Sequence, residues 1–287
     1  MKFSVKTLFA FLAIVFLVSS CRSSDDDQAA PNITAAETNG LLKIKEFSND
    51  RHIIELYSKS GTTALGYNEI KLRIKDKATS LYEKNASISW KPMMHMAAMM
   101  HSSPNSPVEK ENPESALYSG YIVFQMPGNA AEYWDLKIDY TIGSKKYSAS
   151  TVLDVPVESK KTVNSFVGSD NVKYILAYIE PKSPKVATND LTVGVWKMQD
   201  ANNFPMVNGY TVKVDPRMPA MGNHSSPNNV HAKQNSAGKL YTGKLAFTMT
   251  GYWKINLQLI NTEGVTVAGQ EVTEASAASS IFFEIDF

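Results

Sequence analysis

The sequence contains one cysteine, Cys21, among 287 residues, and this residue lies close to the N-terminus. The rest of the chain therefore has no thiol with which to build a disulfide framework, a zinc ribbon, an iron–sulfur site or a CxxCH haem attachment. A blue-copper electron-transfer centre is excluded as well, because that centre requires a thiolate ligand.

The chain also has no excess charge of either sign and no recognisable catalytic motif. It carries 29 basic and 28 acidic residues, interspersed along its length. No basic face indicates a nucleic-acid partner. The sequence has no nucleophile elbow, no HExxH motif and no acid–base constellation, so we expect that the protein is not an enzyme.

The longest apolar run near the N-terminus, Leu8 to Val18, is too short to span a bilayer, which takes roughly 20 apolar residues. It follows two lysines and ends within "LVSSC" at 17–21, so residues 1–20 are predicted to be a secretory signal peptide. "LVSSC" resembles a bacterial lipobox, in which the cysteine becomes the lipidated N-terminus. We therefore predict that Cys21 anchors the protein to the membrane. The alternative is an ordinary signal peptide with a chance cysteine.

Residues 21–40 are polar and include the acidic triplet "DDD", so they are predicted to form a flexible tether after the lipidated cysteine. Acidic residues at this position resemble the surface-export signals of Bacteroidetes lipoproteins. The resemblance implies an outer-membrane lipoprotein of the cell envelope, either periplasmic or surface-exposed. The alternative reading of the triplet is a solvated spacer.

An internal repeat divides the remaining sequence. The pentapeptide "HSSPN" occurs at 101–105 and again at 224–228, and the dipeptide "YW" occurs at 133–134 and again at 252–253. The two "HSSPN" segments are 123 residues apart and the two "YW" dipeptides are 119 residues apart. The difference reflects a four-residue insertion, "NAAE", in the first copy. We therefore predict one domain at 41–160 and a second copy of it at 161–287.

Each copy has the period-two hydrophobic pattern that is typical of β-strands. "NEIKLRIKD" alternates Ile70, Leu72 and Ile74 with polar neighbours, and the segments that begin at Trp134 and Trp253 alternate in the same way. About seven short strands per copy, separated by Gly, Pro and Asn, favour an all-β fold. We predict two tandem immunoglobulin-like antiparallel β-sandwich domains.

Methionine and histidine gather in two stretches, one in each copy. The first is "KPMMHMAAMMHSSP" at 91–104, and the second is "VDPRMPAMGNHSSPNNVH" at 214–231. Pro216, Pro219, Gly222 and Pro227 indicate that the second stretch is a loop without regular structure. A solvated loop has no packing requirement for methionine.

Soft thioether sulfur prefers soft metals of low charge, above all Cu(I), and imidazole completes such sites. We therefore predict a Cu(I) or Ag(I) site in each copy and no other cofactor. The candidate ligands are Met93, Met94, His95, Met96, Met99, Met100 and His101 in the first copy, and Met218, Met221, His224 and His231 in the second. The alternatives are an apolar lid in the first copy and a chance Met/His pair in the second.

Four further residues beside these stretches are predicted to belong to the core. Met249 lies eight residues beyond Tyr241 on a stripe with Leu245 and Phe247, and Met126 has the same place in the first copy. Trp134 and Trp253 begin alternating strands. None of these four is expected to bind metal.

The segment "MPAMGNH…YTGKLAFTMTGYWKINLQL" and its counterpart "MMHMAAMMH…YSGYIVFQMPG…YWDLKIDY" resemble the YtkA-like/FixH-like domains. Members of that group are envelope proteins associated with copper handling and cytochrome oxidase assembly. The resemblance implies copper trafficking, storage or resistance, with a copper-accepting or copper-exporting envelope protein as partner. The duplication and the lipid anchor depart from the family pattern. The alternative is a structural or adhesive surface lipoprotein that binds a protein or glycan through its β-sandwiches.

Overall fold

The computed structural model describes residues 36–287, so the predictions for the signal peptide and for Cys21 lie outside the described residues. Apart from one 3₁₀ turn and a helical stub at 36–37, the regular structure of this part is β, and its strand pairs are antiparallel. The prediction of an all-β antiparallel fold is confirmed. No helix in the described part is long and apolar enough to cross a membrane.

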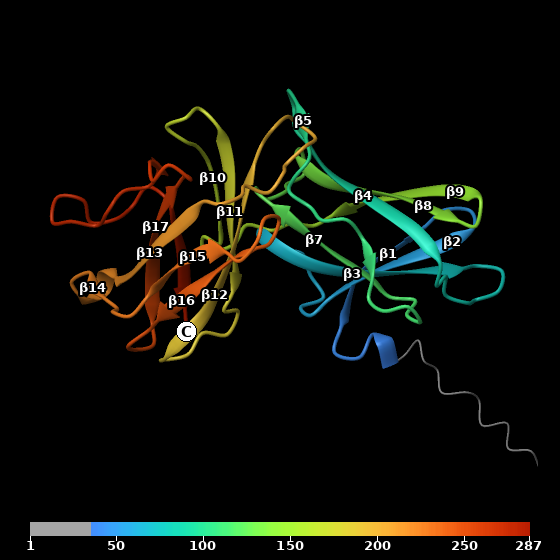
Figure 1. Ribbon diagram of the computed structural model, residues 1–287. Helices are drawn as coiled ribbons and strands as arrows, with labels where there is room; N and C mark the ends of the chain where they lie inside the picture. The colour runs from blue at the N-terminus through green and yellow to red at the C-terminus, as the bar shows by residue number, and fades with distance from the viewer. Residues whose placement is uncertain (1–35) are drawn as a thin grey trace, which may run out of the picture. The chain divides into compact units, whose positions relative to one another are not determined.

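The first half forms two sheets that enclose one core (Figure 1). One sheet has the strand order β1 (Leu42–Ser48), β2 (His52–Ser58), β3 (Gly66–Asp76), β7 (Tyr118–Phe124) and β6 (Glu109–Lys110). The other has the order β5 (Met100–His101), β4 (Ala86–His95), β8 (Tyr133–Ile142) and β9 (Lys145–Leu153). Alternate residues of β3 and β8 face inward, among them Ile70, Leu72, Trp134 and Leu136, and all four are fully buried.

The second half is one hydrogen-bonded sheet wrapped around a core of its own. Its order is β10 (Val163–Val167), β11 (Lys173–Glu180), β12 (Thr188–Lys197), β16 (Tyr241–Ala246), β15 (Val230–Gln234), β13 (Thr211–Met218), β17 (Tyr252–Ile260) and β18 (Thr266–Ala268). Two further strands, β14 (His224–Ser225) and β19 (Phe282–Asp286), pair with β13 and β17. Strand β15 pairs with both β16 and β13, so it joins the strands β10, β11, β12 and β16 to the strands β13, β17 and β18 in one continuous sheet.

The two halves close corresponding turns with the same side-chain hydrogen bonds. Asn68 Oδ1 accepts the N–H of Ala64, and Asn189 Oδ1 accepts the N–H of Lys185. The amide group of each asparagine then donates back to two carbonyls of the same turn. These two turns therefore have the same hydrogen-bond pattern.

The described residues, 36–287, belong to one compact unit, and the division at 160/161 stays a prediction. A third apolar cluster takes Val123 from the first half, and Val163, Ile175, Trp196 and Phe204 from beyond residue 160.

The last residues of the predicted tether, 36–40, make hydrogen bonds. Glu37 Oε1 accepts the backbone N–H of Ala116 at 3.0 Å, and two local turn bonds run from Asn39 to Ala36 and from Leu41 to Thr38. Glu37 thus contacts the folded part, which composition alone does not reveal.

Candidate functional site

The first Met/His stretch is a β-hairpin and not a solvated loop. Strand β4 carries Met93, Met94 and His95, the chain turns between Met96 and Met99, and β5 returns (Figure 1). Directly opposite residues on the two strands are Met94 with His101 and His95 with Met100. The second stretch also starts in a strand, because β13 continues to Met218 and pairs there with His224.

The prediction that prolines forbid regular structure at the second stretch is wrong for Pro216. This residue lies within β13 and pairs with Ile255 of β17. Its carbonyl accepts the N–H of Ser226 on the opposite side, and Pro92 of β4 likewise accepts the Ser102 hydroxyl. The N–H and C=O of one strand residue point to the same side of the strand. The N–H that proline lacks would therefore point toward the short neighbouring strand, β14 for Pro216 and β5 for Pro92, where few backbone hydrogen bonds form.

The hairpin separates the candidate ligands of the first half onto two faces, because successive side chains of a strand point to opposite sides. The inner face carries Met94, which is fully buried, and His101, which is 6% exposed. Met96 packs against the same core. The outer side carries Met93, His95 and Met100, and Met99 stands at the turn. These seven residues cannot share one site.

His101 is held in place by two polar contacts of its Nδ1 atom. This atom lies 2.7 Å from the Ser102 carbonyl oxygen and 3.2 Å from the Gln125 amide nitrogen. The carbonyl can only accept a hydrogen bond and the amide nitrogen can only donate one, so the two contacts favour opposite tautomers of the imidazole. The ring also packs edge-on against Trp134, with 5.8 Å between centroids.

The outer face is accessible to solvent. Met99 and Met100 are 53% and 47% exposed. The His95 ring stacks on Tyr133 at 4.7 Å with 9° between the planes, which fixes the imidazole beside the opposite residue Met100. Sequence reasoning missed Tyr133 as a neighbour of the candidate ligands, although the repeated "YW" dipeptide was the available signal.

In the second half, Met218 and Met221 have different roles. Met218 is 5% exposed and belongs to the core, so the expectation that it lies in a loop is wrong. Met221 is exposed in the 3₁₀ turn η1 (Pro219–Met221), which ends at Gly222 with a φ of 63°. His224 is exposed as well. Around this turn, the accessible candidate ligands are thus Met221 and His224.

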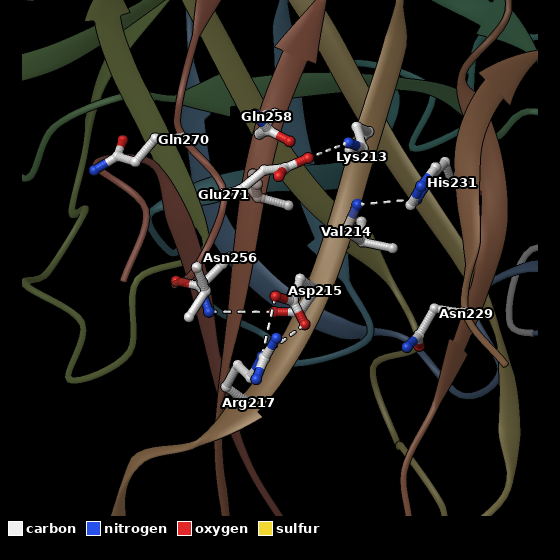
Figure 2. A pocket seen from close by; sticks show the side chains of 12 residues that line it. Lys213, Val214, Asp215, Arg217, Asn229, His231, Asn256, Gln258, Gln270 and Glu271 are labelled. Atoms are coloured by element: carbon white, nitrogen blue, oxygen red, sulfur yellow. Dashed lines mark hydrogen bonds and ion pairs between the residues drawn. The ribbon is translucent and has the colours of Figure 1, made fainter. Parts of the chain in front are cut away.

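His231 lies apart from these residues. It belongs to β15, and the Val214 N–H donates to its Nδ1 at 3.3 Å (Figure 2). Val214 precedes Met218 by four residues on β13, about 14 Å of strand. Because Nδ1 accepts a hydrogen bond, the ring proton is on Nε2, so neither nitrogen is free. Burial, with the charges of Lys213 and Lys233, lowers the His231 pKa.

His231 lines a polar pocket of about 390 Å³ on the second half (Figure 2). The Lys213 ammonium pairs with Glu271 at 3.0 Å across it. Arg217 Nε donates to both carboxylate oxygens of Asp215 at 2.9 and 3.0 Å. Amide side chains complete the lining, namely Asn229, Asn256, Gln258 and Gln270.

The four residues predicted to be core lie where expected. Trp134 and Trp253 are fully buried, and each donates its indole N–H to the carbonyl of a methionine, Met126 or Met249. Both methionines are partly buried against the cores.

Residues 166–258 match the YtkA-like family model. The match lies within the second half and covers less than half of the chain, so the resemblance is confirmed for this segment and not for the first half. A search of curated proteins found no match.

Two solved structures show distant similarity. The surface layer protein SbsC, domains 4–9, is 13% identical with a TM-score of 0.27; the alignment covers 79% of this chain and 30% of that chain. The Escherichia coli adhesin FdeC is 13% identical with a TM-score of 0.25, covering 87% of this chain and 82% of that one. Neither similarity is close enough to indicate function.

Proposed function

We propose that the protein is a cell-envelope lipoprotein, anchored through Cys21, that carries Cu(I) or Ag(I) on its two Met/His hairpins. The observation that carries this proposal is the repeated cross-strand pairing of methionine with histidine, Met94 with His101 and Met218 with His224. Sulfur and imidazole together suit a soft monovalent metal, and methionine needs no deprotonation to bind it.

Exchange of metal with a partner protein requires accessible ligands. In the first half these are Met93, His95, Met99 and Met100, and in the second half they are Met221 and His224. The inner pair, Met94 and His101, places a thioether and an imidazole on the core side of the same hairpin. This arrangement supports a role in trafficking, storage or resistance, with a copper-accepting or copper-exporting envelope protein as partner.

We further propose that residues 41–160 are a second copy of the YtkA-like domain. The matching hydrogen bonds of Asn68 and Asn189, and of Trp134 and Trp253, support this reading. The first hairpin has more exposed sulfur than the second, so we expect it to bind more metal.

A second candidate function is adhesion, in which the β-sandwiches bind a protein or glycan. The polar pocket around His231 favours it, because amide and charged side chains can hydrogen-bond sugar hydroxyls. A copper carrier should bind Cu(I) in a titration, whereas an adhesive protein should not.

The test is competition for Cu(I) against a chromogenic chelator under reducing conditions. We expect tighter than micromolar binding by the wild type, partial loss in the variants H95A/M99A/M100A and M221A/H224A, and near-complete loss when they are combined. The control M249L removes a thioether and keeps the volume of the side chain, so it should bind as the wild type does. Wild-type uptake by the combined variant, or no binding by the wild type, would refute the carrier proposal.

A further inference from the structure

A second group of potential metal ligands lies in the first half, away from the hairpin. His52 begins β2, Asp76 ends β3, and Glu83 follows the next turn. The Nε2 atom of His52 is 4.0 Å from Asp76 Oδ2 and 3.9 Å from Glu83 Oε1. The three donor atoms lie within 4.8 Å of one another. Spacing along the chain gives no hint of this group, because only the pairing of β2 with β3 brings His52 opposite Asp76.

His52 is held rigidly with Nε2 facing the carboxylates. The residue is 2% exposed, and its ring packs edge-on against Tyr140 and Tyr147 at centroid distances of 5.5 and 4.7 Å. Its Nδ1 lies 3.0 Å from the Tyr140 hydroxyl, which in turn accepts a hydrogen bond from Asn49 Nδ2. Histidines that bind metal generally engage their second nitrogen in this way.

The two carboxylates differ in how firmly they are held. Asp76 is 5% exposed, and its Oδ1 accepts the backbone N–H groups of Ala78 and Thr79. Its Oδ2 pairs with the Arg51 guanidinium at 2.6 Å, and the Arg51 side chain is 52% exposed. The Glu83 side chain is 26% exposed, and its Oε1 atom lies 3.9 Å from His52 Nε2. It is therefore free to shift toward an ion.

We propose that His52, Asp76 and Glu83 bind one divalent transition-metal cation of the Zn²⁺ class. One imidazole nitrogen and two carboxylates are borderline-to-hard donors, which suit Zn²⁺ and not Cu(I). Ligand atoms about 2.0–2.2 Å from a Zn²⁺ ion lie closer together than 4 Å, so binding requires a small contraction, which the Glu83 side chain can supply. The Nδ1–H of His52 then donates to the Tyr140 oxygen, and Arg51 turns out to solvent.

This site is independent of the proposed copper function. Tyr140 lies six residues beyond Trp134 on β8, and Trp134 pairs with Met94 of the hairpin, so about 20 Å of strand separates the two places. Their donor sets also select different metals. The failure of one proposal therefore leaves the other standing.

The test is a Zn²⁺ titration of the purified full-length protein after chelator treatment, with and without saturating Ag(I) to block the hairpins. We expect one Zn²⁺ per chain in the micromolar range under both conditions. The variant E83Q should weaken binding by about tenfold or more, because it removes a ligand at a partly exposed position. R51Q should strengthen binding, because it removes the cation that competes for Asp76. The exposed control E109Q makes the same charge change elsewhere and should leave affinity unchanged.

Substitution with Co²⁺ gives a second readout that does not depend on stability. Wild-type and E109Q protein should show the visible d–d absorption of a protein-bound Co²⁺ ion, and E83Q should lose or shift it. Equal Zn²⁺ affinity for E83Q and E109Q would overturn the proposal. Loss of Zn²⁺ binding on addition of Ag(I) would do the same, because it would assign the zinc to the Met/His hairpins.

Discussion

Met94 lies directly opposite His101 across the β4–β5 hairpin, and both side chains are buried. Met218 and His224 occupy the same relationship across β13 and β14, but there only the methionine is buried. One methionine of each hairpin thus belongs to the core, while the sulfur atoms at the turns remain accessible. This division determines which substitutions test metal binding and which test stability.

Replacing Met94 with alanine should destabilise the protein by about 2–5 kcal/mol, because the side chain is fully buried and leaves a cavity. Replacing Met99, which is 53% exposed, should change the free energy of unfolding by less than about 0.5 kcal/mol. Chemical denaturation of both variants measures the difference. Equal stabilities would show that the hairpin does not pack as described.

Glu55 should contribute stability that is lost in acid. Burial alone would raise its pKa, but hydrogen bonds from Lys43, Tyr57 and Tyr82, with the charge of Arg73, outweigh burial and lower the pKa to about 2. A carboxylate with a depressed pKa stabilises the fold fully above its unfolded-state pKa, and this contribution disappears as the pH falls toward 2. A shift of this size corresponds to about 3 kcal/mol.

The variant E55Q tests this expectation. At pH 7 it should be less stable than the wild type by at least about 3 kcal/mol, because it also removes the carboxylate that pairs with the buried Arg73 at 3.0 Å. The difference in the free energy of unfolding between E55Q and the wild type should become smaller when urea denaturation is repeated at successively lower pH down to 3. The exposed control E114Q should show no such pH-dependent gap. A gap for E55Q that stays constant with pH would remove Glu55 as the titrating group.

The fragment 161–287 should fold by itself, because its strands enclose their own core. We expect a cooperative thermal transition at a lower temperature than that of the intact chain, because the fragment lacks Val123, which packs with Trp196 and Phe204. A fragment that binds ANS and melts without cooperativity would indicate one fused core. The V123A variant of the full chain is the matched control for the lost contact.

Replacing Cys21 with serine should abolish lipid attachment and release the protein from the membrane fraction. The reason is chemical, since a serine hydroxyl cannot form the thioether to the diacylglycerol. Labelled fatty acid and fractionation of the cells measure both effects. Incorporation of label by the Cys21→Ser protein would show that "LVSSC" is not a lipobox.

Much of the β architecture could be predicted from short patterns. The alternation of Ile70, Leu72 and Ile74 marks β3, and all three side chains are fully buried. Trp134 and Trp253, the second residues of β8 and β17, are core residues, as their alternating neighbours indicate. These predictions succeed because a strand with one buried face must repeat every two residues.

The arrangement of the Met/His residues could not be predicted in the same way. Proline and glycine around Met218 suggest a loop, yet Pro216 is compatible with β13 because only a short strand pairs on the side where its donor is missing. His231 follows the hairpin closely in sequence, but β15 carries it to the polar pocket. Neither outcome depends on local residue preference.

The sequence by itself therefore determined the strands, the repeat and the residue types available for soft-metal chemistry, because these depend on periodicity and composition. Only the tertiary structure decided which methionines and histidines are buried and which carboxylates face His52. Those properties depend on strand register and on contacts between segments far apart in the chain, and a shift of one residue in register would turn every side chain of a strand to the other face.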